Sequence, residues 1–129
     1  RKKQERTTQR TNIITKEIVT VQLQEKLIGA DGITLINEDQ ILLTQAYELE
    51  NKNYTTGALK LLYSSDNWQT ALITDKKNTD CLNPTNSVKV DNYVYTINSS
   101  IGAYQFQGKD QDKYSFLKLK LTPYNKVYN

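Results

Sequence analysis

The side chains that most often perform acid–base or nucleophilic chemistry are scarce in this 129-residue sequence, which contains no His and one Cys. Without His there can be no Ser-His-Asp or Cys-His site and no His-ligated metal centre. The single Cys81 also excludes a Cys-rich zinc site and an internal disulfide. Cys81 lies in a polar stretch, and we interpret it as a small buried residue or an intermolecular bridge rather than a nucleophile.

Carboxylates could serve as acids or bases only if burial raised a pKa, and no pair of them stands out. Glu48 and Glu50 lie two residues apart in a stretch of mixed pattern, and Asp110 and Asp112 lie in a charged turn. The turn begins like a calcium loop, but that pattern fails at Tyr114. We expect solvated surface acids, and we assign no catalytic residue, no metal ligand and no cofactor. The chain is therefore expected not to be an enzyme.

Positive charge and aromatic rings are the features that could bind nucleic acid. The net charge is +3, and all three Arg residues lie in the first ten positions together with two Lys. The candidate DNA contacts there are Arg1, Lys2, Lys3, Arg6 and Arg10. Two other interpretations of this cluster carry equal weight with each other: a solvated basic tail, and part of a helix that begins upstream of Arg1.

Lysines and tyrosines further along the chain add to the same possibility. Lys118 and Lys120 share one face of a predicted strand, and nine Tyr offer stacking surfaces. Tyr93, Tyr95 and Tyr104 are interpreted first as residues that pack on a sheet face. The sequence has no ribonucleoprotein-type or helix-turn-helix signature, so nucleic-acid binding is an alternative and not the leading hypothesis.

Residues 12–28 are compatible with a helix or with a strand. The choice between the two decides which element packs on the rest of the chain. Four apolar residues fall on one helical face, namely Ile14, Ile18, Val21 and Ile28. Gly29 follows as a helix stop. Against this, Val19 to Gln24 alternates as a half-buried strand would. We favour a helix over residues 1–29 because of the length of the pattern.

After Gly29 the sequence becomes typical of strands. Residues 30–56 are predicted to be a connector with a short strand-like run at Ile33–Ile36. Residues 57–129 are predicted to form the sheet, with strands at Ala58–Tyr63, Trp68–Thr74, Val88–Ile97 and Leu117–Leu121 and a long loop at Asp75–Ser87. Val88–Ile97 is either one strand or two strands folded at Asp91-Asn92. The predicted fold class is α+β: one domain over residues 1–129, with a long N-terminal helix packed on an antiparallel meander of four to six strands.

This layout resembles the soluble part of a type IV pilin-like protein, a minor pilin or pseudopilin. Asp80-Cys81-Leu82, within the Asp75–Ser87 loop, is similar to a short stretch of PilW-type minor pilins. No run of eighteen apolar residues is present, so the membrane-held helix of that family would lie upstream of Arg1. Ile14, Ile18, Val21 and Ile28 would then be assembly-helix residues.

The resemblance implies a non-enzymatic structural subunit of a type IV pilus, a type II secretion system or a DNA-uptake machine. Its partners would be other pilin or pseudopilin subunits, and it would lie at the cell surface or in the periplasm, held by an inner-membrane anchor. One alternative is a periplasmic or extracellular scaffold domain of a type IV secretion system, with further helices in residues 37–56. The other is a nucleic-acid-binding module that uses the basic N-terminal segment.

Overall fold

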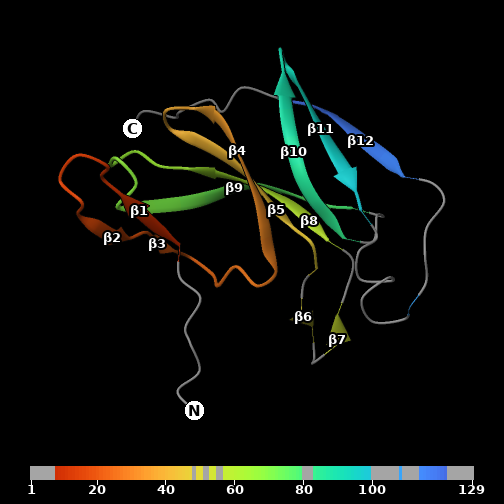
Figure 1. The fold of residues 1–129 in the computed structure, drawn as a ribbon, viewed down its shortest axis with the longest axis horizontal. Helices are drawn as coiled ribbons and strands as arrows, with labels where there is room; N and C mark the ends of the chain where they lie inside the picture. Colours follow the sequence, from red (N-terminus) through yellow and green to blue (C-terminus); the bar gives the residue numbers. More distant parts are fainter. Residues whose placement is uncertain are drawn as a thin grey trace.

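The computed structural model describes residues 8–47, 49–50, 53–54, 57–79, 83–99, 108 and 114–121, and in these residues it contains strands and no helix (Figure 1). The strands are β1 (Gln9–Thr11), β2 (Ile18–Thr20), β3 (Gln22–Leu23), β4 (Ala30–Asn37), β5 (Gln40–Gln45), β6 (Leu49–Glu50), β7 (Asn53–Tyr54), β8 (Ala58–Tyr63), β9 (Thr70–Asn78), β10 (Pro84–Val90), β11 (Tyr93–Asn98) and β12 (Ser115–Lys120). The α+β prediction is therefore wrong, and the described part of the chain is all-β.

The predicted N-terminal helix is replaced by a hairpin and a short third strand. β1 and β2 pair antiparallel, and β3 pairs parallel with β9. The physical reason lies in the residue types: Ile13 to Val21 is rich in β-branched side chains, whose restricted χ1 angles disfavour a helix and suit a strand. Gly29 does adopt the positive φ expected of a stop residue, at 68°, but it precedes β4 instead of ending a helix.

A five-stranded sheet in the order β3-β9-β8-β5-β4 forms the centre of the structure. Its four longer strands are antiparallel neighbours. The strand β5 lies within residues 37–56, where a connector or, in the scaffold alternative, helices were expected. Its central position follows from its sequence, because Leu42, Leu43 and Thr44 are buried on both faces of the sheet.

A three-stranded antiparallel sheet, β10-β11-β12, packs against one face of the larger sheet. The buried residues between the two sheets are Leu42, Leu59 and Val94. Leucines of β12 pack on this cluster from the side of the smaller sheet. Val94 is completely buried, so the face of β11 that carries it is fixed toward the core and the opposite face points outward.

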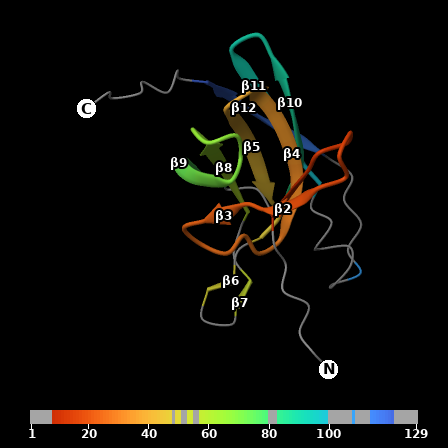
Figure 2. The same ribbon diagram turned by 90° about the vertical axis from the view of Figure 1, so that its left-hand side faces the viewer.

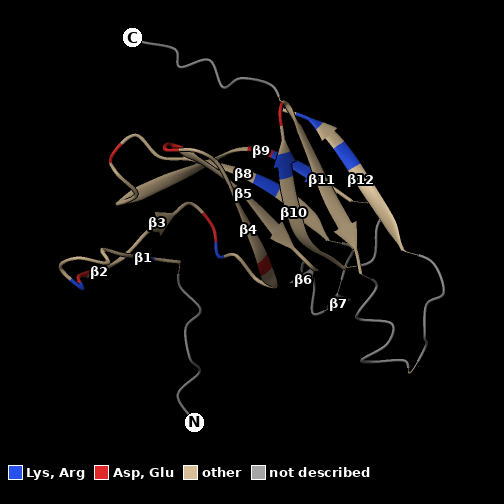
Figure 3. Ribbon diagram, turned by 45° about the horizontal axis from the view of Figure 1, so that its top comes forward, with Lys and Arg blue, Asp and Glu red and all other residues tan. Residues whose placement is uncertain are grey.

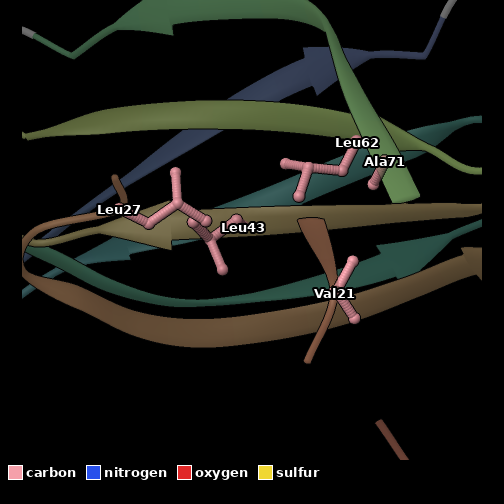
Figure 4. Close-up of a cluster of buried hydrophobic side chains, with 5 residues drawn as sticks. All are labelled: Val21, Leu27, Leu43, Leu62 and Ala71. Carbon is pink, nitrogen blue, oxygen red and sulfur yellow. The ribbon is translucent and has the colours of Figure 1, made fainter. Parts of the chain in front are cut away.

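The residues on either side of β3, which is an edge strand of the five-stranded sheet, cover the other face of the longer strands. This segment lies in front of those strands in Figure 2. Val21 and Leu27 of this segment pack on Leu43, Leu62 and Ala71 of the sheet, and Figure 4 shows the five side chains together. The apolar residues of the predicted helix therefore do pack on a core, but they do so from an extended chain.

The polar stretch Asp75–Ser87 was expected to be the longest loop, and this expectation is wrong. Strand β9 continues to Asn78 and β10 begins at Pro84. Residues 75–78 are exposed, so their polarity reflects exposure and not irregular backbone. Val88–Ile97 follows the second of its two interpretations, because the chain folds at Asp91-Asn92 into β10 and β11.

The part of the chain that the structure describes contains no helix long and apolar enough to cross a lipid bilayer.

Candidate functional site

The residues considered for acid–base or metal chemistry lie outside the part of the chain whose side chains the structure describes. Four of them lie outside the described residues, namely Glu48, Cys81, Asp110 and Asp112. Glu50 lies on β6, but its side chain is outside the description. Among the described residues, no group of three or more His, Cys, Asp or Glu side chains could hold a metal ion.

The four assembly-helix candidates do not share a face. Val21 is 5% exposed in the core, whereas Ile14 is 86% exposed in the β1–β2 turn. Ile18 is exposed on β2, and Ile28 is exposed in the segment that precedes β4. The spacing that aligned them assumed 3.6 residues per turn, and an extended chain does not preserve that alignment.

The N-terminal basic cluster is described only at its end. Arg1, Lys2, Lys3 and Arg6 lie outside the described residues. Arg10 lies on β1, half-buried, and its Nε atom is buried with no hydrogen-bond partner in the described part of the chain. A DNA-contact role for these residues remains a prediction.

The outer face of the three-stranded sheet does bring predicted residues together. Because Val94 and Leu119 face the core, Tyr93 and Tyr95 on β11 and Lys118 on β12 face outward. Register confirms the grouping, since Tyr95 is directly opposite Lys118 and Tyr93 is directly opposite Lys120. We call this surface the outer face and define it by the outward residues Val88, Val90, Tyr93, Tyr95, Ile97, Phe116, Lys118 and Lys120.

The outer face is apolar and aromatic to a degree that is unusual for an uncovered sheet face. Phe116 is 68% exposed, and Val88 and Val90 are each at least half exposed. Contiguous exposed apolar side chains of this kind mark interaction surfaces in soluble proteins. Sequence reasoning missed these three residues, although their alternation in phase with Tyr93 and Lys118 was the signal that could have found them.

The Lys118 ammonium group lies over two of the aromatic rings of the outer face. Its Nζ lies 4.3 Å from the ring centroid of Tyr93 and 5.7 Å from that of Tyr95. Both distances fall within the range of a favourable cation–π interaction. The lysine remains exposed to solvent, so its ammonium group can contact an external anion while it lies over the rings.

The outward positions of β10, β11 and β12 that the structure describes carry no acidic residue. In Figure 3, β12 carries Lys residues and β11 carries neither charge type, while the acidic residue nearest to them on the chain, Asp91, is in the β10–β11 turn. Coulomb attraction toward an anionic ligand is therefore not cancelled locally.

The inner side of the same sheet fixes the outer face in place through a chain of hydroxyl groups. Thr44 Oγ1 lies 3.1 Å from Ser87 Oγ, and Ser87 Oγ lies 2.7 Å from Thr96 Oγ1. In addition, the Thr34 hydroxyl donates to the Ser87 carbonyl oxygen at 2.8 Å. These bonds join β4 and β5 of the large sheet to β10 and β11, so the strands that carry the outer face are anchored to the core.

A hollow of about 220 Å³ opens between the two sheets beside the outer face. Its walls are mainly leucines, including Leu59, Leu61 and Leu121, and the charged residues that line it are Asp75, Lys77 and Lys120. Lys120 therefore belongs to both the outer face and the hollow, and it extends the positive charge around the edge of β12.

No family model matches this chain, and neither the curated proteins nor the solved structures contain a match.

Proposed function

We propose that this chain is a non-enzymatic binding module that recognises single-stranded nucleic acid with the outer face of β10, β11 and β12. The observation that carries the proposal is Lys118 lying over Tyr93 and Tyr95 on a sheet face whose described outward positions include no acidic residue. Aromatic rings and cations in one surface are the two components that bind unpaired bases and phosphates.

The spacing of the aromatic residues fits a strand of unpaired nucleotides. Tyr93 and Tyr95 are two residues apart on one face, which separates them by about 7 Å along the strand. Phe116 continues the aromatic surface onto the neighbouring strand, where it is directly opposite Ile97. Bases that stack on such residues need to be splayed out of a duplex, as single-stranded chains allow.

The arrangement supports single-stranded ligands over duplex DNA. Major-groove recognition needs a helix or a protruding two-stranded ribbon that enters the groove. The outer face is a three-stranded surface, and its aromatic rings would meet only the outside of a duplex. We therefore expect little affinity for double-stranded DNA beyond a weak electrostatic component.

The leading sequence-based hypothesis, a pilin or pseudopilin subunit, loses its main structural premise. It relied on a helix over residues 1–29, and residues 8–29 contain β1, β2 and β3 instead. What the present proposal keeps from it is a non-enzymatic role exercised through surface contacts. The ligand is that of the nucleic-acid alternative, but the proposed contact surface is the outer face and not residues 1–10.

Fluorescence anisotropy with a labelled oligothymidylate of about 20 nucleotides tests the proposal in buffer of low ionic strength. Loss of one stacking partner costs about 1–3 kcal/mol, so Tyr95→Ala and Phe116→Ala should each weaken binding roughly tenfold to a hundredfold. Leu35→Ala is the matched control for Phe116→Ala, because both side chains are 68% exposed on an edge strand of their sheet.

Charge variants provide a second control within the same sheet. Lys118→Gln should weaken binding and lower the steepness of its salt dependence, by about 0.7 in the slope of log K against log salt. Lys89→Gln removes the same charge from β10 at the position opposite Val94, on the inward-facing side, and should have a smaller effect. Equal losses for the two variants, or unchanged affinity for Tyr95→Ala and Phe116→Ala, would show that the outer face is not the binding surface.

A further inference from the structure

A second exposed apolar feature lies far from the outer face, in the turn of the β1–β2 hairpin. Ile13 and Ile14 in the turn are 79% and 86% exposed, and Ile18 at the start of β2 is 60% exposed. Figure 1 shows β1 and β2 at one end of the molecule and β12 at the other. The two features therefore cannot belong to one contact surface.

The turn holds the isoleucines outward by a defined set of hydrogen bonds. The Asn12 side-chain oxygen accepts the backbone N–H groups of Ile14 and Thr15 at 3.0 and 3.1 Å. The Lys16 N–H donates to the Asn12 carbonyl at 2.8 Å, and Lys16 takes a positive φ of 65°. At the base of the hairpin, the Val21 N–H donates to the Thr8 carbonyl at 2.8 Å. Two adjacent isoleucines are thus presented to solvent by a closed turn.

The charges around this turn indicate what covers it. Arg10 lies on β1 and Lys16 lies within the turn. In the sequence they follow Arg1, Lys2, Lys3 and Arg6, and the acidic residues of this stretch are Glu5 and Glu17, so residues 1–17 contain six basic and two acidic residues. A basic segment with an apolar tip is complementary to a surface that is negatively charged outside and apolar beneath.

We propose that the β1–β2 hairpin docks on an anionic lipid bilayer, with Ile13 and Ile14 inserted below the headgroups. Basic residues near an anionic leaflet are attracted to its negative surface potential, which supplies attraction at a distance. Burial of the isoleucine side chains in the acyl region then supplies the short-range component. The hairpin satisfies its own backbone groups at the turn, so shallow insertion leaves few unpaired N–H groups there.

Vesicle co-sedimentation of the full chain tests the proposal, with phosphatidylglycerol vesicles compared with phosphatidylcholine vesicles. The unmodified chain should bind the anionic vesicles and leave the zwitterionic ones in the supernatant. The double substitution Ile13→Ser and Ile14→Ser should lower the partition coefficient about tenfold or more, because both side chains then lose their transfer free energy. Ile33→Ser is the matched control, since Ile33 is 63% exposed on β4 and should leave binding unchanged.

Insertion can also be followed directly with the variant Ile14→Trp. Its added tryptophan emission should shift to shorter wavelength with phosphatidylglycerol vesicles, while native Trp68 is hydrogen-bonded to the Glu38 carbonyl and supplies a constant background. Absence of binding to anionic vesicles, unchanged binding after the double substitution, or no spectral shift would each overturn the proposal. These readouts involve no nucleic acid and no outer-face residue, so they stand or fall independently of the proposed function.

Discussion

The hydroxyl chain between the two sheets offers a sharp test of how the outer face is held. Thr44 and Thr96 are almost completely buried, at 0% and 1% exposed, and Ser87 lies between them. Replacing either threonine with valine keeps its shape and removes one hydrogen bond. Each single substitution should therefore lower the free energy of unfolding by about 1 kcal/mol.

Combined substitutions test whether the three hydroxyl groups stabilise the fold as one hydrogen-bond network. In the double variant Thr44→Val and Thr96→Val, the Ser87 hydroxyl loses both of its hydroxyl partners, and the total cost should reach roughly 2–3 kcal/mol. Adding Ser87→Ala removes the stranded hydroxyl group. The triple variant should then recover about 1 kcal/mol relative to the double variant, the lower end of the range because Ser87 is only partly buried.

Urea denaturation followed by far-ultraviolet circular dichroism measures these differences. For a chain of this size, 1 kcal/mol corresponds to a change in midpoint temperature of roughly 4 °C, so thermal melting gives an independent check. The reasoning fails if the triple variant is less stable than the double variant. It also fails if the double variant is as stable as the unmodified protein, because the sheets would then not be joined through these groups.

Three further predictions concern the core, a turn and a close backbone approach. Lys60 is buried and paired with Glu25, so Glu25→Ala should destabilise the fold by about 1–2 kcal/mol in urea denaturation and Lys60→Met should cost less. Hydrogen bonds from Thr70 lower the pKa of Asp66. The Asp66 carboxylate therefore contributes stability above the usual carboxyl pKa, and this contribution is lost as the pH falls through the lowered pKa. Asp66→Asn should flatten the acid side of a profile of unfolding free energy against pH. A Cβ on Gly57 would lie 2.5 Å from the Gln45 carbonyl oxygen, so Gly57→Ala should lower the melting temperature by several degrees, and a neutral result would contradict the packing of this segment.

The strands of residues 57–99 could be predicted from the sequence where local and tertiary preferences agree. Ala58–Tyr63 matches β8, and the polar residues that follow it form a turn in which the Asp66 carboxylate accepts the Thr70 N–H at 2.9 Å. Both signals are local, an apolar run followed by polar turn residues. A local pattern is sufficient in such a case.

Residues 12–28 could not be predicted because their apolar spacing is compatible with two kinds of element. What decides between them is contact with residues far along the chain, such as Val21 with Leu62 and β3 with β9. The run of β-branched residues was the local signal that deserved more weight than the length of the pattern. Similarly, the exposed strand end at residues 75–78 resembles a loop in composition, because polarity reports exposure and not backbone geometry.

The candidate site was predicted in part. Tyr93, Tyr95, Lys118 and Lys120 were singled out by residue type as possible nucleic-acid contacts, but the tyrosines were expected first to pack on a sheet face. Their meeting on one face depends on the register between β11 and β12, which pairs Tyr95 with Lys118 across 22 intervening residues. A pairing over this separation leaves no local signal in the sequence.

The most direct test of the central claim is a nuclear magnetic resonance titration of the full chain with unlabelled oligothymidylate. The account predicts that the ring signals of Tyr93, Tyr95 and Phe116 shift progressively, while the methyl signals of Val94 and Leu119 on the inward side stay in place. Shifts confined to other surfaces, such as Ile33 and Leu35 on β4, with the three rings unchanged, would contradict it.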